Sequence, residues 1–190
     1  MTGTPQTRRH APSTRFLHWV TAGLVLAALL IGFVMVSSVG EYARLVVIHK
    51  TLGVTILVVV LVRVVNRLTH RGPAMPATVG PLERKLIVLS EVSLYALLLI
   101  QPLVGWAMVS ASGQPVVVLG SLRLPRIAPF STDVFWVLRQ THSVVAYSLM
   151  AVIAAHISAV VWHTVTLRDG MLSRMTFGPA RAGQSGDPAG

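Results

Sequence analysis

The chain contains no cysteine, and only 12% of its 190 residues are charged. The missing thiols exclude disulfide bonds, thiolate metal ligands, iron–sulfur clusters and the covalent attachment of a c-type haem. Any haem must therefore be held without a covalent bond to the protein. Since a soluble domain usually has about 25% charged residues, the low charge indicates a protein that lies in a membrane.

The charges that are present are mostly of one sign. The 16 Lys and Arg residues exceed the 6 Asp and Glu residues, so the formal net charge is +10 and the pI is near 11.6. Such a balance can indicate nucleic-acid binding. Here, however, the basic residues cluster beside apolar runs, as juxtamembrane residues do. We therefore expect contact with membrane lipid and no nucleic-acid partner.

Four apolar segments each approach the roughly 20 residues that a helix needs to cross a bilayer. They cover about 16–38, 45–68, 86–109 and 136–166. Because only helices and closed barrels span lipid, the sequence predicts an all-α protein, a transmembrane four-helix bundle over residues 15–169. The basic segment 1–14 is predicted to be a disordered tail, and segment 170–190, which ends in GQSGDPAG, a flexible tail.

Basic residues are distributed unequally between the two ends of this predicted bundle. Both tails and the loop between the second and third segments carry more Lys and Arg than the other two loops. By the positive-inside rule, both termini then lie in the cytoplasm. The loop 110–135, which contains several Gly and Pro residues, is expected outside as a compact cap.

Four histidines lie inside the apolar segments, where an ionisable side chain is costly and marks a functional site by default. They are His18, His49, His142 and His156. The last two are 14 residues apart, so on one helix they differ by about 40° around the axis and about 21 Å along it. The fourth helix thus presents both on one face at two depths. Antiparallel packing then pairs His18 with His156 on the inner side and His49 with His142 on the outer side.

Two histidines that face each other across a bundle core are one way to hold a haem iron. The two pairs therefore predict two haems at different depths. Zinc is a weaker fit, because it prefers four ligands around one ion. In the alternative without a cofactor, the histidines are core residues that hydrogen-bond neighbouring helices.

Basic residues lie near both predicted pairs. Arg63 is 14 residues after the histidine of the second segment, so one helix brings it to the level of the inner pair. Haem propionates would supply the countercharge that Arg63, and with it Arg67, needs; the alternative is that these side chains snorkel to the interface. The other expected haem or propionate contacts are Lys50, Gly53 and Arg139. The glycine would clear room for the macrocycle or for helix packing.

Two further titratable residues are candidates for a quinone or proton site. Glu91 lies about two turns into the third segment, which has no histidine, and it either relays protons or pairs with Arg84 or a neighbouring arginine. His163 is seven residues after His156, on nearly the same face and nearer the cytoplasm. It is either a quinone or proton contact or a solvated interfacial histidine beside Trp162.

Several short runs resemble the bacterial cytochrome b561 family, which includes superoxide oxidase and is similar to the b-type subunits of nickel hydrogenases and formate dehydrogenases. The runs are RFLHW (15–19), HKTLG (49–53), LVRVVNRL (61–68), QPLVGWAM (101–108), SGQPVVVLG (112–120) and the pair THS…AAHIS of the fourth segment. The resemblance implies a four-helix protein of the bacterial inner membrane with two b haems. It also implies that the four histidines above are the axial ligands.

Three hypotheses of function follow. In the first, the chain is an oxidoreductase: the resemblance implies that superoxide outside gives electrons to the haems and that ubiquinone is reduced. A cationic outer mouth would attract the anion. The outer loops offer Arg44, Lys50, Arg123, Arg126 and Arg139 against only Glu41 and Asp133. In the second, it is a haem b relay or anchor subunit between a partner dehydrogenase or periplasmic donor and the quinone pool. The third is a haem-free membrane scaffold.

Overall fold

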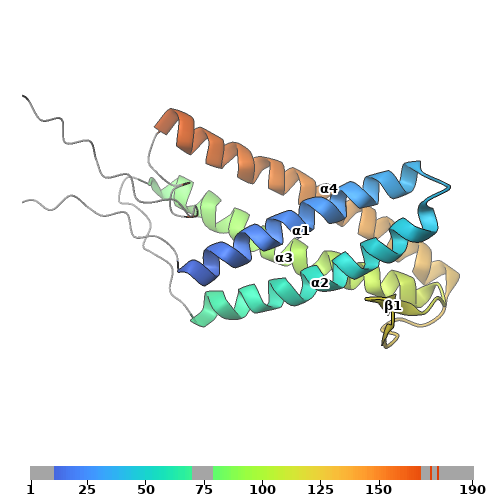
Figure 1. Ribbon diagram of the computed structural model, residues 1–190. Helices are drawn as coiled ribbons and strands as arrows, with labels where there is room; N and C mark the ends of the chain where they lie inside the picture. The colour runs from blue at the N-terminus through green and yellow to red at the C-terminus, as the bar shows by residue number, and fades with distance from the viewer. Residues whose placement is uncertain (1–10, 70–78, 168–171, 173–174, 176–190) are drawn as a thin grey trace, which may run out of the picture.

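Four long helices form an elongated bundle (Figure 1). The computed structural model describes residues 11–69 and 79–167, together with Leu172 and Met175. The helices are α1 (Pro12–Ser37), α2 (Tyr42–Thr69), α3 (Pro81–Ala111) and α4 (Thr132–Trp162), and a π-helical turn, η1 (His163–Leu167), extends the last. Each is long and apolar enough to cross a membrane. The predicted transmembrane four-helix architecture is therefore confirmed.

The helices extend beyond the apolar segments from which they were predicted. α1 begins at Pro12, so residues 12–14, which were predicted to belong to a disordered tail, are helical. A proline in the first turn costs no hydrogen bond, because that N–H would lack a helical partner in any case. α3 begins at Pro81, where the Glu83 carboxylate accepts a hydrogen bond from the Gly80 N–H at 3.3 Å. Residues 1–10 and most of 170–190 lie outside the described residues.

The helices pack in chain order. α1 packs on α2, α2 on α3, and α3 on α4. Near mid-length, one apolar cluster receives side chains from all four helices. Its buried members are Val25, Ala28, Ile56, Val60, Leu98 and Leu149. About half of the other apolar side chains of the helices are exposed, as expected for surfaces that face lipid.

A short antiparallel hairpin, β1 (Val116–Val118) and β2 (Leu122–Leu124), follows α3 at one end of the bundle. We call this the hairpin end; the terminal end is the opposite one, where α1 begins and α4 ends (Figure 1). Hydrogen bonds fix the connection to two helices. The Leu119 N–H donates to the Thr51 hydroxyl of α2 at 3.3 Å, and the Trp106 indole of α3 donates to the carbonyl of Pro125 at 2.9 Å. The connection thus closes the bundle at this end.

A fully buried serine supplies another of these attachments. The Ser110 hydroxyl accepts a hydrogen bond from the Ile127 N–H at 3.3 Å. In Ser110→Ala this amide loses its acceptor, at a cost of about 1–3 kcal/mol. We expect faster hydrogen exchange at Ile127, measured by mass spectrometry. The control is Ser143→Ala, whose exposed hydroxyl donates within its own helix. Equal exchange in both variants would show that Ser110 does not hold this segment.

Candidate functional site

A cavity of about 790 Å³ lies between the helices at the hairpin end. Side chains of all four helices and of β1 line it, and most of them are apolar. His49 of α2 and His142 of α4 contribute imidazoles to this lining. The cavity therefore contains the two histidines that the sequence paired on the outer side.

The imidazoles of His49 and His142 face each other. Their ring centroids are 6.2 Å apart, and their planes are inclined at 77°. Each ring lies against a glycine of the helix on which its own helix packs. A Cβ atom added to Gly32 of α1 would lie 3.3 Å from Cε1 of His49, and one added to Gly105 of α3 would lie 3.0 Å from Cε1 of His142. The glycines thus leave the space that the two rings fill.

Several polar atoms around this cavity lack a partner in the described part of the chain. They are Nδ1 of His49, Nδ1 of His142 and Oε1 of Gln101, all of them buried. The other side-chain atom of this amide, Nε2 of Gln101, lies 3.2 Å from Nε2 of His142. A buried polar group without a hydrogen bond costs about 1–3 kcal/mol, and such a group calls for an explanation such as a ligand. The cluster indicates a site that binds one.

The donor set fits a haem iron. Metal–imidazole bonds are about 2 Å long, so two rings that bind one ion from opposite sides have centres roughly 6 Å apart. The observed separation is 6.2 Å. Over the described ranges, no three His, Asp or Glu side chains gather as a metal-ion site would need, whereas zinc prefers four ligands. Two imidazoles at this separation in the lining of a large apolar cavity would therefore suit a haem, whose iron His49 and His142 would hold.

Three more residues that the sequence predicted as haem or propionate contacts line the same cavity. They are Lys50, Gly53 and Arg139. A Cβ atom added to Gly53 would meet no other atom within 4 Å, so this glycine borders open space. The Arg139 guanidinium also lies 5.7 Å from the ring centroid of Trp136. The positions agree with the predicted contacts, whose roles stay predictions.

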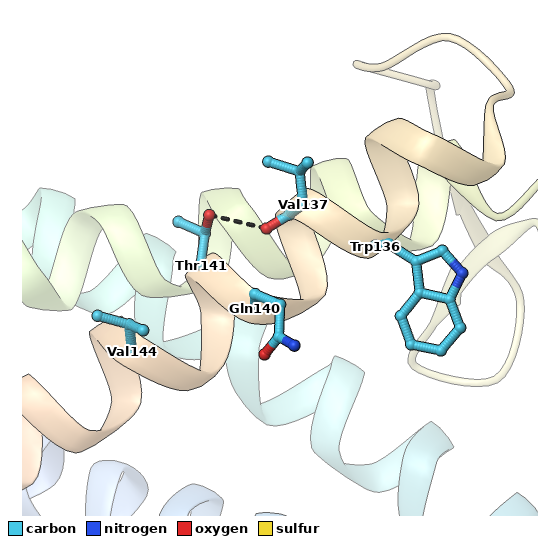
Figure 2. A pocket seen from close by; sticks show the side chains of 5 residues that line it. All are labelled: Trp136, Val137, Gln140, Thr141 and Val144. Atoms are coloured by element: carbon cyan, nitrogen blue, oxygen red, sulfur yellow. Dashed lines mark hydrogen bonds between the residues drawn. The ribbon is translucent and has the colours of Figure 1, made fainter.

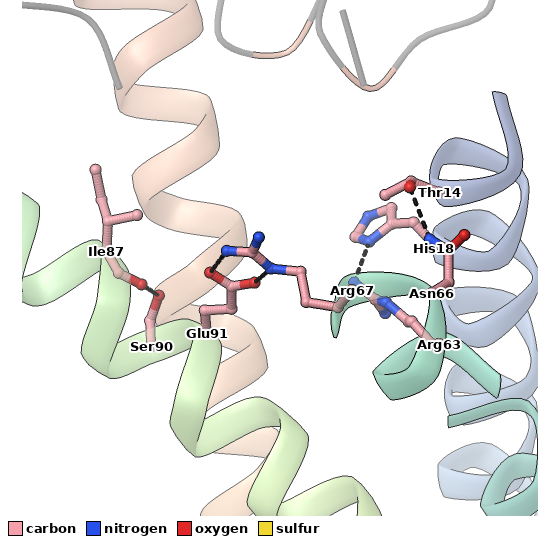
Figure 3. A network of polar contacts seen from close by, with 8 residues as sticks. All are labelled: Thr14, His18, Arg63, Asn66, Arg67, Ile87, Ser90 and Glu91. Carbon is pink, nitrogen blue, oxygen red and sulfur yellow. Dashed lines mark hydrogen bonds and ion pairs between the residues drawn. The ribbon is translucent and has the colours of Figure 1, made fainter. Parts of the chain in front are cut away.

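At the terminal end, Arg63 lies beside His18 (Figure 3). Its Nη2 lies 3.0 Å from Nδ1 of His18, and its guanidinium carbon lies 5.1 Å from the ring centroid of Tyr95. The same charge is close enough to His156 for a Coulomb interaction. Arg63 is thus at the level of His18, as the spacing along α2 predicted. The pairing of His18 with His156 stays a prediction.

Arg67 and Glu91 form an ion pair between α2 and α3. Nε of Arg67 lies 2.8 Å from Oε1 of Glu91, and Nη2 lies 3.4 Å from Oε2. The carboxylate therefore has a cationic partner, but the partner is Arg67 of the neighbouring helix rather than Arg84. The guanidinium of Arg67 is held by this contact, so snorkelling alone does not describe it.

His163 is buried, with 8% of its surface exposed. Its Nε2 lies 3.0 Å from a carboxylate oxygen of Glu83 at the start of α3. The interpretation as a solvated interfacial histidine is therefore wrong, because the π-helical turn carries the ring against α3. A role as a quinone or proton contact stays a prediction.

Three residues were not predicted as site residues from the sequence. They are Gln101 and Gly105 at the cavity and Tyr95 beside Arg63. For Gln101 the signal was available, since it is a carboxamide in the middle of an apolar run. The role of Gly105 depends on how α4 rotates against α3, and one helix does not reveal this. The contact of Tyr95 with Arg63 depends in the same way on how α2 rotates against α3.

A shallower groove along α4 near the hairpin end contains none of the predicted site residues (Figure 2). Its lining is Trp136, Val137, Gln140, Thr141 and Val144. The Thr141 hydroxyl donates to the carbonyl of Val137 at 2.8 Å, within its own helix. These side chains are exposed, so on a membrane-spanning helix they face lipid.

Comparison with known proteins adds a family match. The family profile described as prokaryotic cytochrome b561 matches residues 9–178. The chain is 26% identical over 127 residues to Cytochrome b561 homolog 2 of Escherichia coli (strain K12), across 65% of this chain and 66% of that protein. It is 26% identical over 164 residues to Probable superoxide oxidase CybB of Yersinia pestis, across 84% and 90%. It is 24% identical over 170 residues to Cytochrome b561 homolog 1 of the same E. coli strain, across 88% and 96%.

Gly105 offers a test of the cavity. In Gly105→Ala the new Cβ would lie 3.0 Å from Cε1 of His142, so the ring must shift by a few tenths of an ångström relative to His49. We expect a lower haem content of the purified protein, measured by absorbance. The matched control is Gly23→Ala on α1, where a Cβ meets nothing within 4 Å. If the Gly105→Ala protein has the same haem content as the control, haem binding does not depend on the space that Gly105 leaves for the His142 ring.

Proposed function

The chain belongs to the prokaryotic cytochrome b561 family, and we propose that it binds two b haems and couples superoxide oxidation outside the membrane to ubiquinone reduction. Membership makes it a multi-pass protein of the inner membrane that binds haem b and transfers electrons. The number of haems, the donor and the acceptor are the proposed parts. The observation that carries the proposal is the pair His49 and His142, whose ring centroids are 6.2 Å apart in the lining of an apolar cavity.

His49 and His142 hold the outer haem in this proposal. When bound, the haem supplies an iron that takes up and releases one electron at a time. Gly32 and Gly105 give the imidazoles room to face each other. Lys50 and Arg139 place positive charge in the lining, where it suits haem propionates.

His18 and His156 hold the inner haem. Support comes from Arg63, which contacts His18 and acts electrostatically on His156, so one side chain lies near both proposed ligands. A partly buried cation at this depth needs an anionic partner. The propionates of the inner haem would supply it, and Arg63 is their proposed anchor.

Superoxide is proposed as the donor on two grounds. One relative carries the name of a probable superoxide oxidase. In addition, the cavity lining includes Lys50 and Arg139, and its described residues include no Asp or Glu. A cleft lined by positive charge raises the local concentration of a small anion. The proposed orientation places the hairpin end outside, in accord with the positive-inside rule.

Ubiquinone is proposed as the acceptor, and the reaction balances. Two superoxide anions release two electrons and become two O₂, and one ubiquinone takes two electrons and two protons to become ubiquinol. Protons must therefore reach the quinone. Glu91 and His163 are the proposed proton contacts, since each is a titratable group toward the terminal end with a charged partner beside it.

Histidine variants test the two haem sites separately. We expect His142→Ala to lose one component of the b-type absorbance spectrum and His156→Ala to lose a different one, because each variant removes a ligand of one iron. The control is His163→Ala, which should keep both components. Loss of the same component from both ligand variants would contradict two separate sites.

Pulsed superoxide tests the donor. We expect rapid haem reduction followed by ubiquinol formation in purified protein, and a slower second-order reduction in Lys50→Gln and Arg139→Gln, because the cavity loses positive charge. Stopped-flow absorbance measures both steps. Lys85→Gln on α3, at the terminal end, is the matched control and should react at the wild-type rate. Haems that superoxide does not reduce, in a protein that copurifies with a dehydrogenase, would instead favour the relay function.

A further inference from the structure

Two arginines of α2 lie opposite two side chains of α3 at the terminal end, and Figure 3 shows three of the four residues, Arg63, Arg67 and Glu91. On α2, Arg63 and Arg67 lie one turn apart, and on α3 so do Glu91 and Tyr95. The helices place Arg67 opposite Glu91, with nitrogen–oxygen distances of 2.8 and 3.4 Å. They place Arg63 opposite Tyr95, with 5.1 Å between the guanidinium carbon and the ring centroid. Of the two arginines, only Arg67 contacts a carboxylate in the described part of the chain.

The partners of the two arginines therefore differ in charge. Glu91 neutralises Arg67, while Arg63 contacts the imidazole of His18 and the ring of Tyr95, neither of which is an anion. Nε of Arg63 is in addition buried without a hydrogen-bond partner among the described residues. Of these two arginines, therefore, Glu91 neutralises only Arg67.

We propose that Glu91 is a positioning residue that holds the redox potential of the inner haem low by neutralising Arg67. This inference rests on the proposed function, in which His18 and His156 bind that haem. Residues one helical turn apart are about 5–6 Å apart, so an uncompensated Arg67 would add a second cation to that of Arg63. Positive charge near a haem favours the reduced form, which carries one more electron, and so raises the potential.

A simple tether between α2 and α3 is the competing role for this ion pair. The two side chains are 48% and 38% exposed, and an exposed pair contributes little to stability, typically about 0–1 kcal/mol. A tether acts through structure, so loss of either partner would change the protein in the same direction. A charge effect instead predicts opposite shifts from the two partners.

The test compares Glu91→Gln, Arg67→Gln and the double variant in the full-length protein with both haems bound. Midpoint potentials are measured by redox titration, with haem reduction followed by absorbance. The component of the spectrum that His156→Ala loses is assigned to the inner haem. We expect Glu91→Gln to raise the inner potential, Arg67→Gln to lower it, and the double variant to return it toward the wild-type value. Arg67→Lys, which keeps the charge, should leave it in place.

Glu41→Gln supplies the matched control. Glu41 pairs with Arg44 at 4.0 Å on the exposed surface of the hairpin end, so the same chemical change there should leave the inner potential unmoved. The outer potential should change less than the inner one in every Glu91 and Arg67 variant, because the ion pair is at the other end of the bundle.

The possible failures are distinguishable. If both components are present and the inner potential does not move, or moves in the same direction in both single variants, Glu91 does not act through charge and this inference is overturned. If wild-type protein has no component that His156→Ala removes, the two-haem proposal fails, and this inference fails with it.

Discussion

A polar side chain inside a membrane-spanning bundle needs a partner, because lipid offers none. Toward the terminal end, contacts between helices meet this requirement for several side chains. They join Arg67 to Glu91, His163 to Glu83 and Asn66 to Thr14, while Nε of Arg63 stays buried without a hydrogen-bond partner among the described residues. Toward the hairpin end, by contrast, His49, His142 and Gln101 each keep a buried polar atom without a partner in the described part of the chain. The constraint therefore identifies the cavity that His49, Gln101 and His142 line as a place where a ligand is needed.

The packing of the helices explains how this cavity is built. α1 packs on α2 and α3 on α4, and each of these pairs presents one imidazole that lies against one glycine: His49 on Gly32, and His142 on Gly105. The two pairs meet where α2 packs on α3, and the hairpin, fixed to α2 and α3, closes the end of the bundle. The helix pairs thus bring the two rings to 6.2 Å from each other in the lining of an apolar cavity that suits a flat, mostly apolar cofactor.

Much of this arrangement could be predicted from the sequence, because helical periodicity determines which residues share a face. Apolar length predicted the four helices, and spacing predicted that His49 would face His142 and that Arg63 would reach the level of His18. Contacts that depend on the rotation of one helix against another could not be predicted. The partner of Glu91, the burial of His163 and the role of Gly105 are of this kind. The helical start at Pro12 was also missed, since helices continue past the apolar run into their polar ends.

Electron paramagnetic resonance of the oxidised, purified protein tests most directly whether His49 and His142 bind one haem iron. Their planes are inclined at 77°, and nearly perpendicular imidazoles on ferric haem give a highly anisotropic low-spin signal, whereas parallel imidazoles give a rhombic one. We expect a highly anisotropic low-spin signal from the outer haem. A spectrum with only high-spin haem would contradict the binding of one iron by both histidines.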